Sequence, residues 1–179
     1  MGEERELIFS VEIPEEKGSF RKLCKAVGQK NITEFSYRID SEKIGKILLG
    51  LELSGDKKNK IAFMKSMKNK KFNLLDLSND EISKVHLRYM TGGRPSQFPK
   101  GKIEEVFKVD FPERPGALME FLNLLKDKWN ITLFHYKNQG SIYGGALVGF
   151  SIEEIEVEDL QKDLLKSEYP FVRVTKNKG

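Results

Sequence analysis

Two parts of the chain follow the same order of apolar patterns. In the first part, apolar and polar residues alternate over 9–13, which is typical of a half-buried strand. Apolar residues at 20, 23, 24 and 27 then have the i, i+3, i+4, i+7 spacing of an amphipathic helix. Alternation returns over 32–39 and 46–53. The pattern therefore predicts a strand, a helix and two further strands.

A lysine-rich helix and a short strand are expected to complete the first part. Ile61, Met64 and either Met67 or Lys68 stand at helical spacing, so we expect them on the packed face of that helix. Residues 73–77 are expected to form the last strand. The second part repeats the order, with strands predicted at 107–111, 131–136, 145–152 and 171–175 and helices at 117–128 and 157–167.

The two parts also share residues in register. The stretch Phe9-Ser-Val-Glu-Ile-Pro-Glu-Glu-Lys-Gly18 returns 98 positions later as Phe107-Lys-Val-Asp-Phe-Pro-Glu-Arg-Pro-Gly116. Asn31-Ile-Thr-Glu-Phe-Ser-Tyr37 returns 99 positions later as Asn130-Ile-Thr-Leu-Phe-His-Tyr136. Chance seldom produces so many identities with only a one-residue slip in register, so the chain is interpreted as a tandem duplication.

Each part has the order βαββαβ, which is the split-βαβ or ferredoxin-like arrangement. Its strands are expected to form one sheet and its helices to cover one face, giving an α+β fold of two-layer sandwiches. The boundaries predict a first unit at 1–77, a linker with a short helix at 78–102 and a second unit at 103–179.

The linker carries a helix-start signal. Ser78-Asn79-Asp80-Glu81 has the spacing of a capping box, which predicts Ser78 as the N-cap. The helix would carry Ile82, Val85 and Tyr89 on one face, and Gly92-Gly93-Arg94-Pro95 would end it. The spacing of that glycine-rich stretch matches no phosphate-binding motif, which favours a turn.

The composition is that of an ordinary folded protein, because 39% of the 179 residues are apolar and 32% are charged. No apolar run approaches the roughly 18 residues of a spanning helix, so we expect no membrane partner. The charged start Met1-Gly2-Glu3-Glu4-Arg5 is unlike a signal peptide, and Cys24 is the only cysteine. We therefore expect a reducing compartment, either the cytoplasm or the interior of an organelle, and no secretion.

Each unit offers a loop that could receive a small anionic ligand. The loops at 14–18 and 112–116 lead into helices, whose first N–H groups have no partner within the helix. Such an end suits a carboxylate, and Gly18 and Gly116 allow a ligand to approach the backbone closely. The carboxylate of a free amino acid is one ligand of this kind.

No catalytic or metal centre is expected in the chain. His86 and His135 are the only histidines, and neither has a cysteine or carboxylate at metal-ligand spacing. No Ser/His/Asp or Cys/His constellation can be assembled with any specificity. Both patterns favour a binding function over an enzymatic one.

Five segments that run in order along most of the chain carry a family resemblance: Ile13-Pro-Glu-Glu-Lys-Gly-Ser-Phe20, Asn31-Ile-Thr-Glu-Phe-Ser-Tyr-Arg38, His86-Leu-Arg-Tyr-Met-Thr-Gly-Gly-Arg-Pro95, Phe111-Pro-Glu-Arg-Pro-Gly-Ala-Leu118 and Trp129-Asn-Ile-Thr-Leu-Phe-His-Tyr136. These segments resemble the C-terminal regulatory region of biosynthetic threonine deaminase (threonine ammonia-lyase). Lys137 stands where that family usually has arginine, and the tail 176–179 lacks the family's apolar ending.

The resemblance implies two ACT-like units, in agreement with the duplication. It implies that catalysis belongs to a separate, larger domain, which holds pyridoxal phosphate through a Schiff-base lysine and a glycine-rich phosphate cup. Nothing in this chain matches that lysine or that cup, so no cofactor is expected in the chain itself. The threonine deaminase catalytic domain is the expected partner, and because the family is usually tetrameric, a homo-oligomer is expected.

The resemblance further implies isoleucine as a feedback inhibitor and valine as an opposing effector in isoleucine biosynthesis. It associates Tyr37 and Tyr136 with the two effector sites, and Arg88 and Lys137 with feedback sensitivity. From the pattern alone, each tyrosine follows a phenylalanine by two residues and would be a sheet-packing residue. Arg88 could equally be a solvated helix residue or a member of an ion pair.

Two alternative functions stay open at this point. A stand-alone ACT-like amino-acid sensor could regulate a different target. RNA binding is the other alternative, but Gly145 and Leu147 stand where an RNA-recognition motif needs aromatic rings to stack on bases. The net charge of +4 comes from the segment 56–71, which holds seven lysines and one aspartate. One solvated helix face explains such a segment, so we expect no nucleic-acid partner.

Overall fold

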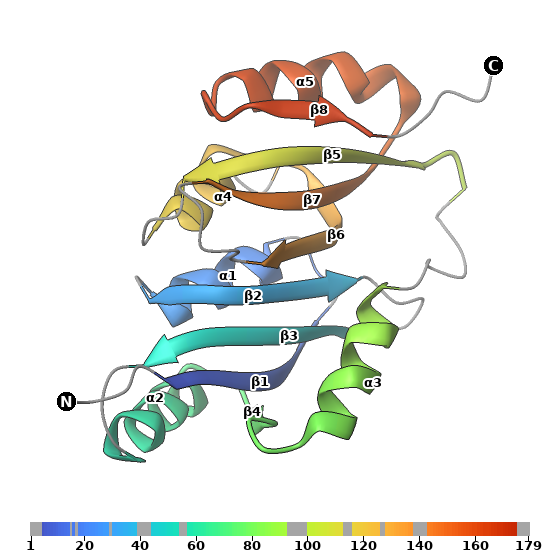
Figure 1. Ribbon diagram of the computed structural model, residues 1–179. Helices are drawn as coiled ribbons and strands as arrows, with labels where there is room; N and C mark the ends of the chain where they lie inside the picture. The colour runs from blue at the N-terminus through green and yellow to red at the C-terminus, as the bar shows by residue number, and fades with distance from the viewer. Residues whose placement is uncertain are drawn as a thin grey trace.

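A single sheet of eight strands runs through both units in the computed structural model of the chain (Figure 1). The structure describes residues 5–14, 16, 18–28, 30–38, 44–53, 57–92, 100–112, 116–125, 128–137 and 143–174. The strand order is β4-β1-β3-β2-β6-β7-β5-β8. The strands are β1 (Arg5–Pro14), β2 (Asn31–Arg38), β3 (Ile44–Leu53), β4 (Leu74–Asp76), β5 (Ile103–Pro112), β6 (Asn130–Lys137), β7 (Tyr143–Ile152) and β8 (Phe171–Arg173).

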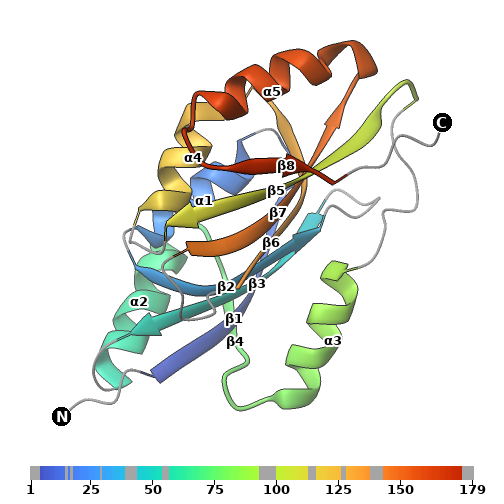
Figure 2. The same cartoon turned by 45° about the horizontal axis from the view of Figure 1, so that its top comes forward.

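Helices cover the two faces of the sheet unequally. Of the described helices, α1, α2, α4 and α5 lie along one face of the sheet, and α3 lies on the other face, which we call the open face (Figure 2). The order βαββαβ occurs twice, so the predicted fold class is confirmed. The helices are α1 (Ser19–Val27), α2 (Lys57–Asn69), α3 (Glu81–Gly92), α4 (Ala117–Leu125) and α5 (Val157–Leu165), with a short 3₁₀ turn, η1 (Glu154–Glu156), before α5.

The two units meet where β2 pairs with β6 in antiparallel register. Phe35 lies opposite Tyr136, and Tyr37 lies opposite Phe134. Phe35 repeats as Phe134 and Tyr37 repeats as Tyr136, so exchanging the two units reproduces the same pairs. An approximate two-fold axis therefore passes through the junction, and each feature of one unit has a counterpart in the other.

A cluster of aromatic rings fills the helix-covered side of this junction. The Phe134 ring contacts the rings of Phe20 at 5.4 Å and Phe35 at 5.8 Å between centroids, and the second contact is edge to face. Phe35 and Phe134 are fully buried. Edge-to-face pairs add about 0.5–1.5 kcal/mol beyond the area that they bury, so the junction is a continuous part of the core.

The Cys24 thiol belongs to this core, as the apolar spacing predicted. Its side chain is buried on α1, and burial raises the pKa of the thiol far above its ordinary value. A buried neutral thiol is a poor nucleophile, so Cys24 acts as a small packing residue.

The packed face of the lysine-rich helix α2 differs from the expected one. The Ile61 side chain is 63% exposed, whereas Phe63 and Met67 are buried and Met64 is partly buried. The Phe63 ring reaches Phe9 of β1, with centroids 5.7 Å apart. Turning the helix to bury Ile61 would expose the larger phenylalanine ring, so the expectation for Ile61 is wrong.

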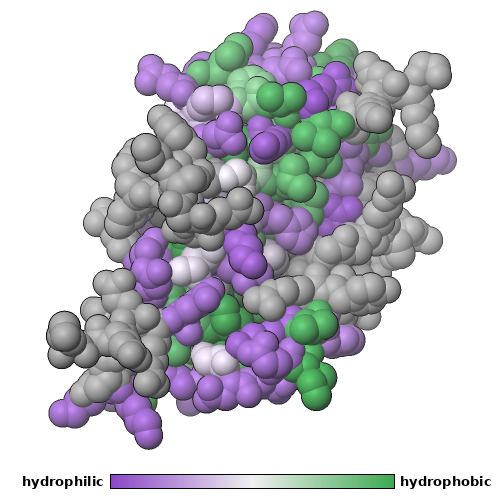
Figure 3. All heavy atoms as spheres, in the orientation of Figure 1, coloured by the Kyte–Doolittle hydropathy of each residue, from purple (hydrophilic) through white to green (hydrophobic). Residues whose placement is uncertain are grey.

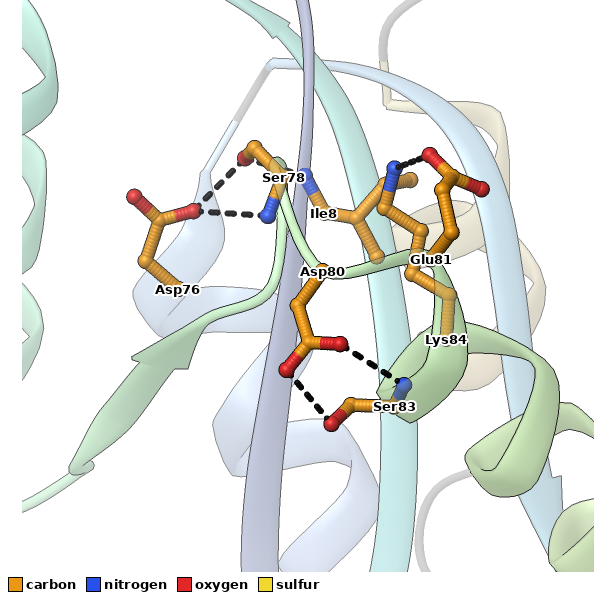
Figure 4. A network of polar contacts seen from close by, with 7 residues as sticks. All are labelled: Ile8, Asp76, Ser78, Asp80, Glu81, Ser83 and Lys84. Atoms are coloured by element: carbon orange, nitrogen blue, oxygen red, sulfur yellow. Dashed lines mark hydrogen bonds and ion pairs between the residues drawn. The ribbon is translucent and has the colours of Figure 1, made fainter.

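The capping residue of α3 is Asp80 and not Ser78, as Figure 4 shows. Asp80 accepts hydrogen bonds from the Ser83 backbone N–H at 2.9 Å and the Ser83 hydroxyl at 2.6 Å. The Ser78 hydroxyl donates to Asp76 and accepts the Ile8 backbone N–H at 3.1 Å. Ser78 therefore ties the incoming chain to β1, and the helix begins two residues later than the capping-box spacing indicates.

The buried face of α3 is also not the expected one. Leu87 packs on Ile8, Leu48 and Leu77 over the open face of the first unit. Ile82 and Val85 point away from the sheet, because they lie on the opposite side of the helix from Leu87. The side chain of Tyr89, the third predicted position, lies outside the described residues. The Gly93-Arg94-Pro95 stretch lies outside them entirely.

Two glycines allow strands to come close at equivalent points of the two units. A Cβ at Gly149 would stand 2.8 Å from the Leu133 Cβ and 3.0 Å from Glu104 Oε1. A Cβ at Gly50 would stand 2.7 Å from the Thr33 hydroxyl. Each contact lies beside a register shift in the neighbouring strand, at 32–34 and at 131–133. At Gly149 a side chain does not fit unless the backbone moves, because the Leu133 Cβ is attached directly to it, whereas at Gly50 the nearest atom is a side-chain hydroxyl.

Substituting Gly149 with alanine tests this close approach. We expect Gly149→Ala to lower the free energy of unfolding by about 1–3 kcal/mol in urea titrations, because the new methyl overpacks the sheet. Gly145→Ala is the matched control in the same strand, because its Cβ would meet the Lys108 Cε at an ordinary 3.5 Å. The control should change stability by less than about 0.5 kcal/mol. Equal losses for both variants would contradict the explanation.

Candidate functional site

A first pocket lies between the start of α1 and the beginning of β6. One wall comes from the first unit and the other comes from the second unit, so neither unit forms the pocket alone. The first unit contributes Ile13, Pro14, Glu16, Gly18, Ser19, Phe20, Arg21 and Tyr37, and the second contributes Leu122, Leu125, Trp129, Asn130 and Ile131.

A second pocket lies at the equivalent position across the approximate two-fold axis. Its walls are again shared: the second unit contributes Phe111, Pro112, Gly116, Ala117, Leu118 and Tyr136, and the first contributes Lys30, Asn31 and Ile32. Gly18 and Tyr37 of the first pocket are the repeat counterparts of Gly116 and Tyr136 in the second. The duplication has therefore produced two related pockets at one junction.

Glycine forms the same turn at the entrance of both pockets. Gly18 has φ of 86° and Gly116 has φ of 89°, both in the left-handed region. The carbonyl of Gly18 accepts the Lys22 N–H at 3.0 Å, and that of Gly116 accepts the Glu120 N–H at 3.0 Å. A residue with a Cβ is strained in this conformation by roughly 1–2 kcal/mol. Glycine thus lets each helix start at the pocket wall, with its first N–H groups beside the pocket.

The two tyrosines reach the pockets from β2 and β6. Tyr37 is only 3% exposed and packs against Phe20, with ring centroids 5.5 Å apart. Tyr136 is half-buried. Tyr37 therefore belongs to the core and to the pocket lining at once, which unites the packing interpretation with the site interpretation.

Charged residues distinguish the two pockets. Glu16 and Arg21 give the first pocket an acid and a base beside the start of α1, whereas Lys30 is the charged residue among the described residues of the second. Trp129 lines the first pocket and occupies the repeat position of Lys30. The first pocket can therefore offer groups of both signs, together with an aromatic wall.

Trp129 is fixed in place by an aspartate of α5. Its indole N–H donates to Asp163 Oδ2 at 2.8 Å. Burial raises the pKa of the Asp163 carboxyl, but hydrogen bonds from Trp129 and Lys128 and the charges of Lys128 and Lys166 outweigh it, so the pKa falls below its ordinary value. The carboxylate stays ionised as an acceptor. Because Trp129 is the only tryptophan, it is a natural optical probe of the first pocket.

Both pockets are small. The cavity volume is about 30 Å³ in the first and about 40 Å³ in the second. Such volumes hold two or three waters, whereas pockets for small-molecule ligands are typically several hundred Å³. A ligand of amino-acid size therefore needs more room than the structure shows, and both units supply the walls that would have to move.

The other two predicted site residues lie apart from the pockets. Arg88 belongs to α3, on the opposite face of the sheet from α1 and α4, and its side chain is outside the described residues. Lys137 is exposed at the end of β6 and lines a groove on the open face with Glu34 and His135. Their role in feedback sensitivity stays a prediction, and the structure gives them no contact with either pocket among the described residues.

The residues that sequence reasoning missed are those supplied by the opposite unit. Leu122, Leu125 and Trp129 cross the junction to the first pocket, and Lys30 crosses to the second. One signal existed: the repeated Asn-Ile-Thr motif starts at the helix–strand junction in each unit. Only the pairing of β2 with β6 brings that junction next to the other unit's glycine turn.

A buried ion pair joins the units on the open face of the sheet. Arg38 Nη1 donates to Glu104 Oε1 at 2.5 Å, and Nη2 donates to Oε2 at 3.1 Å. The Arg38 side chain is 7% exposed, and its Nε has no hydrogen-bond partner in the described part of the chain. Glu104 also accepts the Thr132 hydroxyl at 2.9 Å. At the equivalent point of the other unit, the Thr33 hydroxyl donates to Glu6 and Lys137 replaces the arginine.

Within the described residues, no group of three His, Cys, Asp or Glu side chains comes together to hold a metal ion. Likewise, no helix in the part of the chain that the structure describes is long and apolar enough to cross a lipid bilayer.

Comparison with known proteins gives a consistent result. The family described as the C-terminal regulatory domain of Threonine dehydratase (another name for threonine deaminase) matches residues 1–87 and 99–179. The L-threonine dehydratase biosynthetic IlvA of Burkholderia multivorans is 41% identical over 179 residues, covering 99% of this chain and 34% of that protein.

Two more relatives come from distant organisms. The IlvA of Escherichia coli K12 is 42% identical over 156 residues, covering 87% of this chain and 30% of that protein. The "Threonine dehydratase biosynthetic, chloroplastic" of Arabidopsis thaliana is 37% identical over 177 residues, covering 98% of this chain and 29% of that protein. The chain thus spans about a third of the length of the curated relatives it matches.

Removing one partner of the buried ion pair tests its contribution. We expect Glu104→Gln to lower the free energy of unfolding by about 2–4 kcal/mol, because the Arg38 guanidinium stays buried without a counter-charge. The partial exposure of Glu104 keeps this loss below that of a fully buried pair. The double variant Arg38→Met/Glu104→Leu should recover most of the loss. Lys102→Gln removes the exposed pair with Glu153 and should change stability by less than about 0.5 kcal/mol in the same denaturant titration. Equal losses from Glu104→Gln and Lys102→Gln would contradict a buried inter-unit pair.

Proposed function

This chain belongs to the family of C-terminal regulatory domains of threonine dehydratase, and we propose that it acts by binding branched-chain amino acids between its two units. In this proposal isoleucine is the feedback inhibitor and valine the opposing effector in isoleucine biosynthesis. The observation that carries the proposal is the pair of equivalent pockets, each walled by both units.

The first pocket has the chemistry that a free amino acid requires. The first turn of α1 offers backbone N–H groups and a positive dipole end to the ligand carboxylate, and Arg21 lies in the same wall. Glu16 offers a counter-charge to the ligand ammonium group. Leu122, Leu125 and Ile131 provide an apolar wall for a branched aliphatic side chain. One pocket thus matches all three parts of the ligand.

The shared walls supply a way to transmit binding. Because the pockets are small, we expect a ligand that enters one of them to separate the start of α1 from β6, or the start of α4 from β2. A ligand shifts an equilibrium between two arrangements only by its differential affinity for them. Allosteric coupling of this kind is typically about 1–3 kcal/mol.

Two similar effectors can act in opposite directions if they favour different pockets or different arrangements. Isoleucine and valine differ by one methylene, which a pocket distinguishes by only about 1–3 kcal/mol. The two pockets differ in chemistry as well, since the aromatic Trp129 in the first pocket occupies the repeat position of the charged Lys30 in the second. This asymmetry supports separate preferences for the two pockets.

The proposal makes the chain the regulatory part of a larger enzyme. The catalytic domain, with its pyridoxal phosphate, is the proposed partner, and self-association is part of the proposal. A reducing compartment is proposed as well. The relatives named "chloroplastic" in Arabidopsis thaliana and "mitochondrial" in Schizosaccharomyces pombe make an organelle interior one candidate and the cytoplasm the other.

A titration with two readouts tests the binding proposal. Isoleucine and valine are added separately to the chain, up to millimolar concentration, while heat and Trp129 fluorescence are recorded. We expect heat from both binding events but a fluorescence change only when the first pocket fills, because Trp129 lines that pocket alone. No heat and no thermal stabilisation with either amino acid would contradict the proposal.

Tyrosine variants separate the two pockets in the same titration. We expect Tyr37→Ala to weaken the fluorescence-detected event at least about tenfold, which corresponds to 1.4 kcal/mol, and Tyr136→Ala to leave that event unchanged. Phe171→Ala is the aromatic control, since Phe171 packs on Phe107 at 6.0 Å between ring centroids and neither residue lines a pocket. Identical effects of Tyr37→Ala and Tyr136→Ala would argue against two separate sites.

A further inference from the structure

Among the described residues, a helix covers the open face of the sheet in the first unit and none covers it in the second. In the first unit, Ile8, Leu48 and Leu77 are buried beneath Leu87 of α3. Burial of this cluster is what holds α3 against the sheet. In the second unit, the described residues include no helix over the corresponding surface (Figure 2).

Strand register identifies the counterparts of the covered residues. Ile8 lies opposite Gly50 and Val106 lies opposite Gly149, which are repeat-equivalent pairs. The Leu77 N–H donates to the Ile8 carbonyl at 2.8 Å, and the Val174 N–H donates to the Val106 carbonyl at 2.8 Å. The counterparts of Ile8, Leu48 and Leu77 are therefore Val106, Leu147 and Val174.

These counterparts form an apolar surface that no helix covers in the part of the chain that the structure describes. Leu147 is 39% exposed and Val174 is 47% exposed, and Val172 beside them is more exposed still. We call Val106, Leu147, Val172 and Val174 the bare patch. Lys108 lies within it, opposite Leu147 on one side and Val172 on the other. The patch thus repeats, in apolar character, the surface on which α3 already packs.

The outer side of α3 is the second unusual surface on this face. Ile82 is 85% exposed and Val85 is 62% exposed, and both lie on the side of α3 away from Leu87. Glu81 is exposed next to them. Surface helices normally turn such an apolar stripe inward, so a stripe that points outward indicates a partner.

Both surfaces are on the same side of the molecule. Figure 3 shows apolar side chains gathered over the β5, β7 and β8 region and again over α3. The helix stands above the sheet in one unit while the sheet is bare in the other, so the open face has a raised half and a recessed half.

We propose that the open face is the interface between two copies of this chain, with the outer stripe of α3 from each copy packed on the bare patch of the other. A two-fold arrangement makes each contact twice, and the raised half of one copy then enters the recessed half of the other. The charges beside the two surfaces are complementary, since this arrangement would place the acidic Glu81 of α3 near the basic Lys108 of the patch. In the first unit, the equivalent sheet surface already packs against the helix α3.

A second copy is favoured over other occupants because it supplies both matching surfaces at once. The inference deepens the self-association of the proposed function by naming its surface. It is tested without any amino-acid ligand, so failure of effector binding and failure of this interface are observed in separate experiments.

Sedimentation velocity of the chain over a range of concentrations tests the interface. We expect a concentration-dependent dimer that both Val85→Lys and Leu147→Lys weaken, each raising the dimer dissociation constant at least about tenfold. Ile61→Lys is the matched control, since Ile61 is a similarly exposed apolar residue on α2, on the other face of the sheet. It should change the dissociation constant by less than about twofold.

A charge pair distinguishes this interface from other dimers. Val85→Glu and Leu147→Lys in one chain place opposite charges across both contacts, so the combination should restore part of the dimerisation that either substitution removes. Unchanged thermal melts of the variants show that folding is intact. A chain that stays monomeric at all concentrations overturns the inference, and so does a dimer that Val85→Lys and Leu147→Lys leave unchanged.

Discussion

The antiparallel pairing of β2 with β6 determines the rest of the structure. It joins two small units into one sheet of eight strands and brings Phe20, Phe35 and Phe134 into one aromatic cluster. It also brings the glycine turn of each unit next to the helix–strand junction of the other, which is where both pockets form. Without this pairing, each unit would keep half a pocket and would expose one edge strand to solvent.

The sequence predicted each unit well because every element has a local signal. Alternation identified the strands, and the repeat of Asn31–Tyr37 as Asn130–Tyr136 fixed the correspondence between units. The pairing between units has no such signal, since β2 and β6 differ little in pattern from their neighbours. The predicted Gly18, Tyr37, Gly116 and Tyr136 therefore describe half of each pocket, while Trp129 and Lys30 became evident only from the register of the joined sheet.

Departures from the repeat are as informative as the repeat itself. The amphipathic pattern of α3 gave the wrong buried face, because burying Leu87 over Ile8 and Leu48 leaves Ile82 and Val85 outside. Arg38 forms a buried ion pair with Glu104, while its counterpart Lys137 is exposed. On the open face, the first unit therefore holds the second through a buried ion pair, whereas the equivalent residue of the second unit, Lys137, is exposed. An asymmetric junction suits a regulatory protein, because its two pockets need not respond alike to one ligand.

Hydrogen–deuterium exchange with and without saturating isoleucine tests most directly whether the ligand site is built from both units. If a pocket at the junction binds the ligand, amides from both of its walls slow together, namely 18–22 with 129–133 for the first pocket or 116–120 with 30–34 for the second. Slowing confined to a single unit would contradict a shared site and, with it, the explanation of how binding is transmitted.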